Sequence, residues 1–248
     1  IHVEGNIDPI RDMETINTEL LLADLESVSK RLVKTTKMAK SDKKLQSELE
    51  LLTRINAALE EGKAARTVDI LEHEEEILKT LHLITVKPVL YLCNVDEETF
   101  TNGGNDFTKK VAEFAASEKN ECLILCTAIE SEIALLDESE KTDFLEAMGA
   151  DEPGLNKLIR QSYNLLGLIT YFTAGEKEVR AWTIPDGAKA PQAAGVIHSD
   201  FERGFIRAEA YHCEDLFTLK TELAIKEAGK HKSEGKEYVV KDGDVLLF

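Results

Sequence analysis

The stretch that most constrains the fold runs from Asp12 to Glu61 and contains neither proline nor glycine. Its apolar residues recur at steps of three and four, which places them on one face of a helix. They are Ile16, Leu20, Ala23, Val28, Leu32, Leu45, Leu49, Leu52, Ile55 and Leu59. The apolar pattern lapses between Lys34 and Lys44. We therefore predict two long helices packed as an antiparallel hairpin, with this polar segment at the tip and Gly62 ending the second helix.

Beyond the hairpin, apolar runs alternate with helical segments. The runs at 88–93 and 121–126 have the length and composition of buried strands, and a helix is predicted between them at 106–119. Shorter helices are predicted at 72–80, 131–136, 138–148 and from Pro153 to Leu166. Alternation of helices with fully apolar strands indicates a parallel α/β sheet. Since two strands are too few for such a sheet, we expect sequence before Ile1 to supply the others.

The last part of the chain, from Leu168, has the pattern of an α+β domain. Turn signals such as Pro185-Asp186-Gly187 separate short apolar runs. Strands are predicted at 169–172, 178–183, 205–211, 238–240 and 245–248, and helices at 193–201 and 219–228. We therefore predict an α/β plus α+β fold in three parts, which cover residues 1–84, 85–167 and 168–248.

The composition narrows the classes of function. A formal net charge of −17 argues against a broad nucleic-acid surface, so DNA is not an expected partner and RNA contact requires a local basic patch. No apolar run approaches the roughly 20 residues that cross a bilayer, so no membrane partner is expected. The four cysteines include no C-x-x-C pair, which argues against a zinc site and favours a reduced, cytoplasmic setting.

The segment Asn94-Val95-Asp96-Glu97 follows the first predicted strand, at the edge where parallel α/β sheets bind ligands. GTP-binding proteins carry Asn-Lys-x-Asp there, and the aspartate accepts hydrogen bonds from the ring N–H and the exocyclic amine of guanine. Here Val95 stands in place of the lysine and Glu97 in place of the aspartate. We therefore predict a base-binding loop without a preference for guanine. The alternative is an ordinary polar loop at the end of a strand.

The sequence also indicates which further contacts with a nucleotide such a site could make. Thr127 and Ala128 follow the second predicted strand, where GTPases place a loop whose backbone contacts the base. No G-x-x-x-x-G-K-[ST] motif occurs in these residues, so the backbone cradle and the lysine that hold phosphates are not among them. We therefore predict no catalytic residue and no metal site here. Hydrolysis and tight nucleotide binding are not expected of this chain alone.

A basic segment stands out in the acidic chain. Lys34, Lys37, Lys40 and Lys43 fall where the hairpin tip is predicted. Lysines at such a tip can contact the phosphates of RNA, including those of a ribosome. The alternative is a solvated, lysine-rich tip that contacts no partner.

Several stretches together resemble the YchF-type, Obg-like ATPase family. They are Ile1-His2-Val3-Glu4-Gly5, Ile16-Asn17-Thr18-Glu19-Leu20, Asn94-Val95-Asp96-Glu97, Thr170-Tyr171-Phe172-Thr173-Ala174-Gly175, Gly204-Phe205-Ile206 and Asp242-Gly243-Asp244. The resemblance covers essentially the whole chain. It implies the C-terminal half of a P-loop NTPase sheet with an inserted coiled-coil hairpin, followed by a β-grasp TGS domain.

The resemblance also implies a function, namely a ribosome-associated regulator that binds and hydrolyses ATP with Mg²⁺. Asn94, Val95 and Glu97 would lie at the adenine, with Thr127 and Ala128 beside it. The hairpin tip and the TGS domain would contact the ribosome or RNA. Because the P-loop and the switch regions of the family are not in this sequence, we expect an N-terminally truncated piece. A non-enzymatic RNA- or ribosome-binding module is the alternative.

Overall fold

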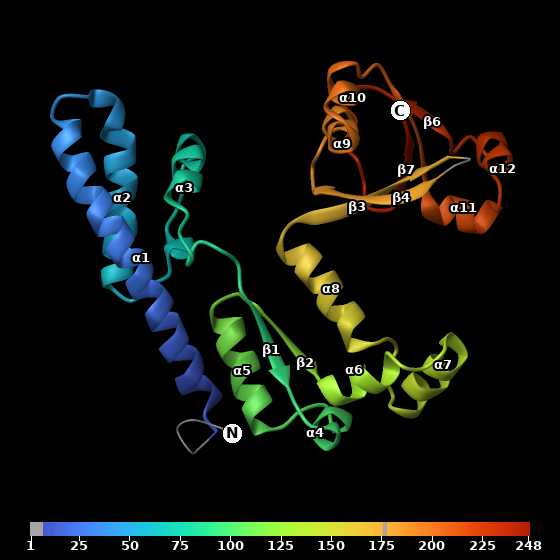
Figure 1. The fold of residues 1–248 in the computed structure, drawn as a ribbon, viewed down its shortest axis with the longest axis horizontal. Helices are drawn as coiled ribbons and strands as arrows, with labels where there is room; N and C mark the ends of the chain where they lie inside the picture. Colours follow the sequence, from blue (N-terminus) through green and yellow to red (C-terminus); the bar gives the residue numbers. More distant parts are fainter. Residues whose placement is uncertain (1–6, 176–177) are drawn as a thin grey trace. The chain divides into compact units, whose positions relative to one another are not determined.

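The computed structural model describes residues 7–175 and 178–248. The chain separates into two compact units, Ile1–Leu155 and Asn156–Phe248 (Figure 1). Each unit has its own helices, strands and buried clusters.

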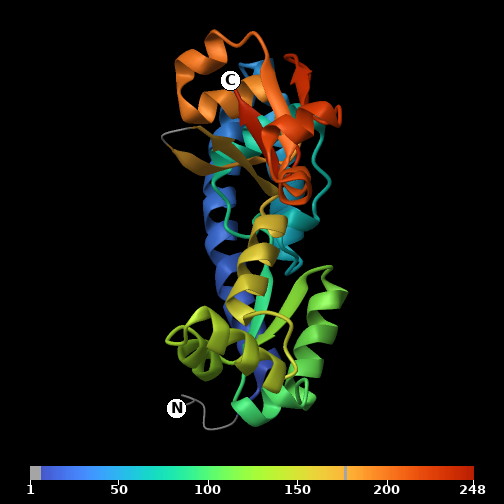
Figure 2. The ribbon, with the colours of Figure 1, turned by 90° about the vertical axis from the view of Figure 1, so that its right-hand side faces the viewer.

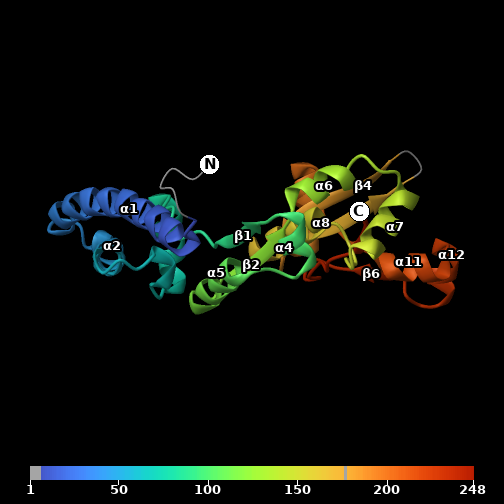
Figure 3. The same cartoon turned by 90° about the horizontal axis from the view of Figure 1, so that it is seen from below.

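The first unit begins with the predicted helical hairpin. Helix α1 (Pro9–Ala39) and helix α2 (Gln46–Glu60) lie side by side, joined by a short 3₁₀ turn, η1 (Lys43–Leu45) (Figure 3). Asp8 caps α1 by accepting a hydrogen bond from the backbone N–H of Arg11. The apolar stripes meet in a cluster of fully buried side chains: Val28, Leu51, Leu52, Ile55 and Leu59. The two predicted helices are therefore confirmed.

The tip of the hairpin is shorter than predicted. Helix α1 continues to Ala39, so Lys34 and Lys37 lie within a helix and only Lys40 and Lys43 belong to the turn. The apolar stripe lapses at Thr35, but this residue is buried and its Oγ1 donates to Glu48 of α2 at 3.3 Å. A polar contact thus continues the helix pairing where the apolar pattern stops, which the sequence pattern alone did not indicate.

The chain returns from the hairpin through short turns held by buried carboxylates. The turns are η2 (Ala65–Thr67) and η3 (Glu72–Glu74). Helix α3 (Glu75–Leu81) follows η3 and starts three residues later than predicted. Asp24 of α1 accepts from the backbone N–H of Ile84 at 2.9 Å and from the N–H and Oγ1 of Thr85, both at 2.7 Å. These bonds fix the returning segment against α1.

A parallel pair of strands follows, as predicted. Strand β1 (Leu90–Asn94) pairs with β2 (Glu121–Leu125) in parallel, from Leu90 opposite Glu121 to Asn94 opposite Leu125. Helix α5 (Asp106–Ser117) connects the strands and lies against them (Figure 2). The sequence missed α4 (Glu97–Thr101), a short helix that exists because Asp96 caps its first turn.

Helices α6 (Thr127–Ile133) and α7 (Glu138–Ala147) follow, and α8 (Gly154–Leu165) begins at the end of the first unit and continues into the second. Helix α6 begins at Thr127, directly after β2, four residues earlier than predicted. The carboxylate of Glu130 accepts hydrogen bonds from the backbone N–H groups of Gly154 at 2.7 Å and Leu155 at 3.0 Å. A side chain of α6 therefore satisfies the free N–H groups at the start of α8.

The second unit is built on a five-stranded sheet with the order β4-β3-β7-β5-β6. Its strands are β3 (Leu168–Ala174), β4 (Val179–Pro185), β5 (Ala208–His212), β6 (Lys232–Glu234) and β7 (Asp244–Leu247). Only the β3–β7 pair is parallel among the pairings described. The sheet therefore combines hairpin neighbours with a crossover that places the last strand at its centre.

Two buried clusters of this unit involve its helices. Helix α9 (Ala190–Ile197) contributes to the first cluster, and α10 (Ser199–Arg203) packs against α9. Helices α11 (Cys213–Leu219) and α12 (Glu222–Glu227) contribute to the second. Tyr171 of β3 is fully buried, and its hydroxyl donates to the carbonyl of Ala193 in α9 at 2.8 Å. Tyr171 and Ile184 belong to the cluster against α9. Val245 and Ile225 belong to the cluster with α11 and α12.

Three predictions for this unit were wrong. The helix predicted at 193–201 is interrupted at His198, whose extended backbone (φ −161°) and ring Nδ1 cap α10. The helix predicted at 219–228 is interrupted at Lys220, which has a left-handed φ of 68°. The strand predicted at 238–240 forms only an isolated bridge between Val239 and Lys189, and β6 was not predicted. Tight turns that the apolar pattern does not encode explain these differences.

Candidate nucleotide-base loop and basic hairpin

Asn94 joins the two loops that leave the parallel strands. Its side-chain Oδ1 accepts a hydrogen bond from the backbone N–H of Thr127 at 3.1 Å, and the N–H of Val95 donates to the carbonyl of Leu125 at 2.9 Å. Because Oδ1 has this partner, the Nδ2 group is the part of the carboxamide left to donate to a ligand. Sequence reasoning placed both loops at one edge of a sheet, and the structure brings Asn94 and Thr127 into contact there.

The other residues of the loop take different positions. Asp96 Oδ1 accepts from the backbone N–H of Thr99 at 2.8 Å, and hydrogen bonds from Thr99 hold the pKa of this carboxyl below its ordinary value. One oxygen of Asp96 is therefore engaged in capping α4. Glu97 is the exposed first residue of α4, Val95 is half-buried, and Ala128 is exposed next to Thr127.

A cavity of about 470 Å³ opens beside this loop. Asn94, Val95 and Asp96 line it, but Glu97, Thr127 and Ala128 do not. Further lining comes from the rest of β1, from α1 and from α5 with its cap, including Met13, Ile16, Asn105, Phe107 and Thr108. Sequence reasoning missed these residues because no local motif links the first turns of α1 to β1. Of the predicted site residues, Asn94 and Val95 therefore line the cavity, whereas Glu97 begins α4 and Thr127 and Ala128 begin α6.

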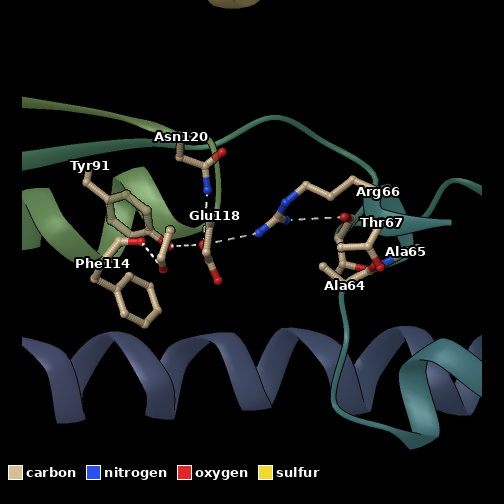
Figure 4. A network of polar contacts seen from close by, with 10 residues as sticks. Ala64, Ala65, Arg66, Thr67, Tyr91, Phe114, Glu118 and Asn120 are labelled. Atoms are coloured by element: carbon tan, nitrogen blue, oxygen red, sulfur yellow. Dashed lines mark hydrogen bonds and ion pairs between the residues drawn. The ribbon is translucent and has the colours of Figure 1, made fainter.

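A polar network anchors the strand that carries Asn94 (Figure 4). The hydroxyl of Tyr91 in β1 donates to Glu118 Oε2 at 2.9 Å, and Arg66 Nη2 lies 3.7 Å from the same oxygen. Arg66 Nη1 also donates to the carbonyl of Thr85 at 3.3 Å. Burial raises the pKa of Tyr91, and the neighbouring Glu118 carboxylate raises it further. The network connects β1 to the base of the helical hairpin.

The lysines of the predicted RNA-contact segment are all exposed. Lys34 and Lys37 project from α1, whereas Lys40 and Lys43 lie at the tip. Among the ion pairs that the described residues form, none involves these four side chains. Between residues 30 and 44 there are seven lysines and arginines but one carboxylate, Asp42. This segment is therefore locally cationic within a chain of net charge −17.

Metal sites and membrane spans are absent from residues 7–175 and 178–248. Within those ranges no group of three or more His, Cys, Asp or Glu side chains is arranged to hold a metal ion. None of the helices described is both long enough and apolar enough to cross a membrane. Asn94 Nδ2 is a hydrogen-bond donor of the kind that a nucleobase can accept from.

Comparison with known proteins finds relatives whose names agree with one another. A family model described as "YchF-GTPase_C: Protein of unknown function (DUF933)" matches residues 168–248. The chain is 53% identical over 249 residues to the Ribosome-binding ATPase YchF of Bacillus subtilis (strain 168), and covers 68% of that protein. It is 40% identical over 250 residues to Obg-like ATPase 1 of Oryza sativa subsp. japonica, and covers 63% of it. Both alignments include all of this chain.

A solved structure agrees with the sequence matches. The chain superimposes on the YchF GTPase of Schizosaccharomyces pombe with a TM-score of 0.89 at 39% sequence identity, covering all of this chain and 68% of that one. The fold is thus the mixed α/β type solved for that GTPase. With this structural match and the 53% identity to the Bacillus protein, the chain belongs to the YchF family, as the resemblance predicted.

Proposed function

We propose that these residues form the base-recognition part of an ATP-binding, ATP-hydrolysing regulator that associates with ribosomes in the cytoplasm. The observation that carries this proposal is the Asn94–Thr127 hydrogen bond, which joins the two strand-end loops at the ligand-binding edge of a parallel pair. The names of the relatives support it, since the Bacillus and Escherichia coli O157:H7 proteins are both called ribosome-binding ATPases.

The chemistry of the loop favours adenine over guanine. The free Nδ2 group of Asn94 can donate to a ring nitrogen, a contact that either purine can accept. Guanine further requires a carboxylate that accepts from its ring N–H and its amine. Glu97 is one methylene longer than the aspartate used for that purpose and stands at the start of α4, and Val95 provides no cationic stem. Asn94, Val95, Glu97, Thr127 and Ala128 therefore suit a base that lacks the guanine N–H.

We also propose how the chain is divided. Residues 1–84 would be the end of a nucleotide-domain segment with its coiled-coil insertion, residues 85–167 the C-terminal part of the NTPase domain, and residues 168–248 a β-grasp TGS domain. The five-stranded sheet with its central last strand supports the third assignment. ATP and Mg²⁺ would be held jointly with phosphate-binding elements that these 248 residues do not include.

The experiment that tests this function compares the chain with the intact protein that carries it. The 248 residues alone should show no magnesium-dependent ATP turnover, because no phosphate-binding motif occurs among them. In the intact protein, Asn94→Ala should weaken ATP binding, because it removes both the Nδ2 donor and the bond to Thr127. Turnover by the isolated chain that Asn94→Ala leaves unchanged would contradict the proposal.

A non-enzymatic role in binding RNA or the ribosome is the second candidate. Four exposed lysines that form no ion pair among the described residues favour it, together with the proposed TGS domain: Lys34, Lys37, Lys40 and Lys43. Changing Lys34, Lys37, Lys40 and Lys43 to Glu should reduce co-sedimentation with ribosomes and flatten its salt dependence, by about 0.7 to 0.9 in log–log slope for each lost phosphate contact. If the wild type and this variant pellet equally, the lysines only solubilise the hairpin.

A further inference from the structure

The base loop at Asn94 is held by the end of β2 and the start of α6. Asn94 Oδ1 accepts from the backbone N–H of Thr127, the first residue of α6, and the N–H of Val95 donates to the carbonyl of Leu125, the last residue of β2. The side chain of Cys126, the N-cap residue of α6, makes no capping hydrogen bond, so the N–H of Thr127 takes its partner from β1 instead. The position of α6 therefore decides how the Asn94 carboxamide is oriented.

The start of α8 packs closely against both of these neighbours. Gly154, the first residue of α8, is buried, and a Cβ at this position would collide with Cδ1 of Leu125 and lie 2.8 Å from Oε1 of Glu130 in α6. Gly154 does not have a left-handed φ, so the backbone conformation does not explain the glycine. Space explains it, because only a residue without a side chain lets the first turn of α8 approach β2 and α6 so closely.

Glu130 supplies the polar part of this contact. Its Oε1 accepts from the N–H of Gly154 at 2.7 Å and its Oε2 from the N–H of Leu155 at 3.0 Å, so one carboxylate satisfies two free donors in the first turn of α8. Its negative charge also lies at the helix end where the dipole favours it. Glu130 is half-buried and stands three residues after Thr127, on the same face of α6. The carboxylate thus fixes α6 one turn away from the N–H that Asn94 accepts.

We propose that Glu130 is a positioning residue for base recognition, which fixes α6 so that Thr127 holds Asn94 Oδ1 and leaves Nδ2 in a fixed direction to donate to the base. The proposal rests on the nucleotide-binding function proposed above and deepens it. Oδ1 and Nδ2 belong to one planar group, so a carboxamide that loses its Thr127 partner rotates about χ2 and no longer presents its donor in one direction. Glu130 therefore acts through Asn94 and not by contacting the base.

Two matched pairs of variants separate this role from general changes in α6 and α8. Glu130→Gln keeps the length of the side chain but removes its charge and one of its two acceptor oxygens. Glu132→Gln makes the same change at an exposed carboxylate of the same helix. Leu155→Pro removes one donor to Glu130 and leaves Glu130 itself unchanged, in a first helical turn where proline is tolerated. Leu155→Ala truncates the same exposed side chain but retains the N–H.

The measurement is calorimetric titration of ADP with Mg²⁺ into the intact protein that carries this chain, with and without Asn94→Ala. ADP carries the base of ATP and is not consumed during the titration. Glu130→Gln and Leu155→Pro should each weaken binding by about three- to tenfold, whereas Glu132→Gln and Leu155→Ala should bind as the wild type does. In the Asn94→Ala background, Glu130→Gln should weaken binding no further, because its effect passes through Asn94.

Steady-state ATP hydrolysis by the same intact protein gives a second measurement. Glu130→Gln should raise KM for ATP by about the same factor as it weakens ADP binding and leave kcat unchanged, because the base contact is the same in the ground state and in the transition state. A fall in kcat with an unchanged KM would contradict the proposal, since it would show an effect on the chemical step and not on the base.

The titrations separate this proposal from the function on which it rests. If Asn94→Ala binds ADP as tightly as the wild type does, the loop does not recognise the base and both proposals fail. If Asn94→Ala binds weakly but Glu130→Gln binds as the wild type does, base recognition stands and the positioning role fails. If Glu130→Gln weakens binding equally with and without Asn94, the carboxylate only supports the fold around α8, and the positioning role is again contradicted.

Discussion

The parallel pair β1–β2 and the five-stranded sheet of the second unit are held in place by different interactions. None of the five residues of β1 is buried, and Leu92 at its centre is 43% exposed. Tyr171, in the centre of β3, is 0% exposed and belongs to a large apolar cluster. The second unit is therefore stabilised by apolar burial, whereas the strand that carries Asn94 depends more on polar contacts such as the Tyr91–Glu118–Arg66 network.

The largest expected loss of stability comes from removing a buried side chain from the apolar cluster of the second unit. Tyr171→Ala removes a buried ring and the hydrogen bond to Ala193, so it should lower the free energy of unfolding by about 3–5 kcal/mol. The measurement is urea denaturation followed by the fluorescence of Trp182, the single tryptophan, which lies in the same sheet. The control Leu92→Ala should shift this transition by less than about 1 kcal/mol. Equal shifts for both variants would contradict the comparison.

A smaller loss of stability is expected at the Asp242-Gly243 turn, where both the backbone conformation and the close packing disfavour a side chain. Gly243 has a φ of 81°, and a Cβ there would lie 2.8 Å from Nε2 of His212. Gly243→Ala should therefore destabilise the second unit by about 2–4 kcal/mol. Gly187 has nearly the same φ, 83°, but a Cβ at that position would meet no atom within 4 Å.

Gly187→Ala is the matched control, because it carries the backbone strain without the collision. It should destabilise by only about 1–2 kcal/mol in the same fluorescence-monitored denaturation. If the two alanine variants unfold at the same urea concentration, the close packing of His212 against the turn contributes nothing measurable.

An effect smaller than those of Tyr171→Ala and Gly243→Ala is expected at a buried carboxylate of the first unit, Glu74. Glu74 is 1% exposed and accepts from Leu71 N–H and from Arg54. Burial alone would raise the pKa of this carboxyl, but these hydrogen bonds and the Arg54 charge bring it below the ordinary 4.5. Glu74→Gln should lower the free energy of unfolding at pH 7 by about 1.5–3 kcal/mol, measured by helical circular dichroism in urea.

The pH dependence follows from the lowered pKa. A carboxyl with a depressed folded pKa stabilises the protein above its unfolded pKa of about 4.5, and this stabilisation is lost as the pH falls through the folded pKa. The difference between wild type and Glu74→Gln should therefore shrink below pH 4.5. Glu76→Gln, at the exposed Lys79 pair, is the control and should have little effect at either pH. A difference that persists in acid would mean that Glu74 acts through packing alone.

The sequence predicted those parts of the structure in which a local pattern carries the information. The two apolar runs became the parallel strands, and the contact between Asn94 and Thr127 followed from placing both at one edge of a sheet. The length of α1 was not predictable from its stripe, because Thr35 replaces an apolar contact with a hydrogen bond to Glu48.

Contacts between distant segments escaped prediction for a related reason. Arg66 and Glu118 lie in segments with no shared motif, and neither residue is unusual in its own surroundings. The segment after α3 is likewise held against α1 by buried bonds between Asp24 and Thr85, which are 61 residues apart in the sequence. The sequence drew attention to the lysines, but it placed Lys34 and Lys37 at the tip instead of along the helix.

The central claim, that the Asn94 loop recognises adenine, is tested most directly by titrating ATP and GTP calorimetrically into the intact protein that carries this chain. We predict tighter binding of ATP, by about tenfold or more, because each guanine group left without a partner costs about 1–3 kcal/mol. The double change Val95→Lys with Glu97→Asp should move the preference towards GTP. Equal affinities for both nucleotides in the wild type, or tighter binding of GTP, would contradict the account.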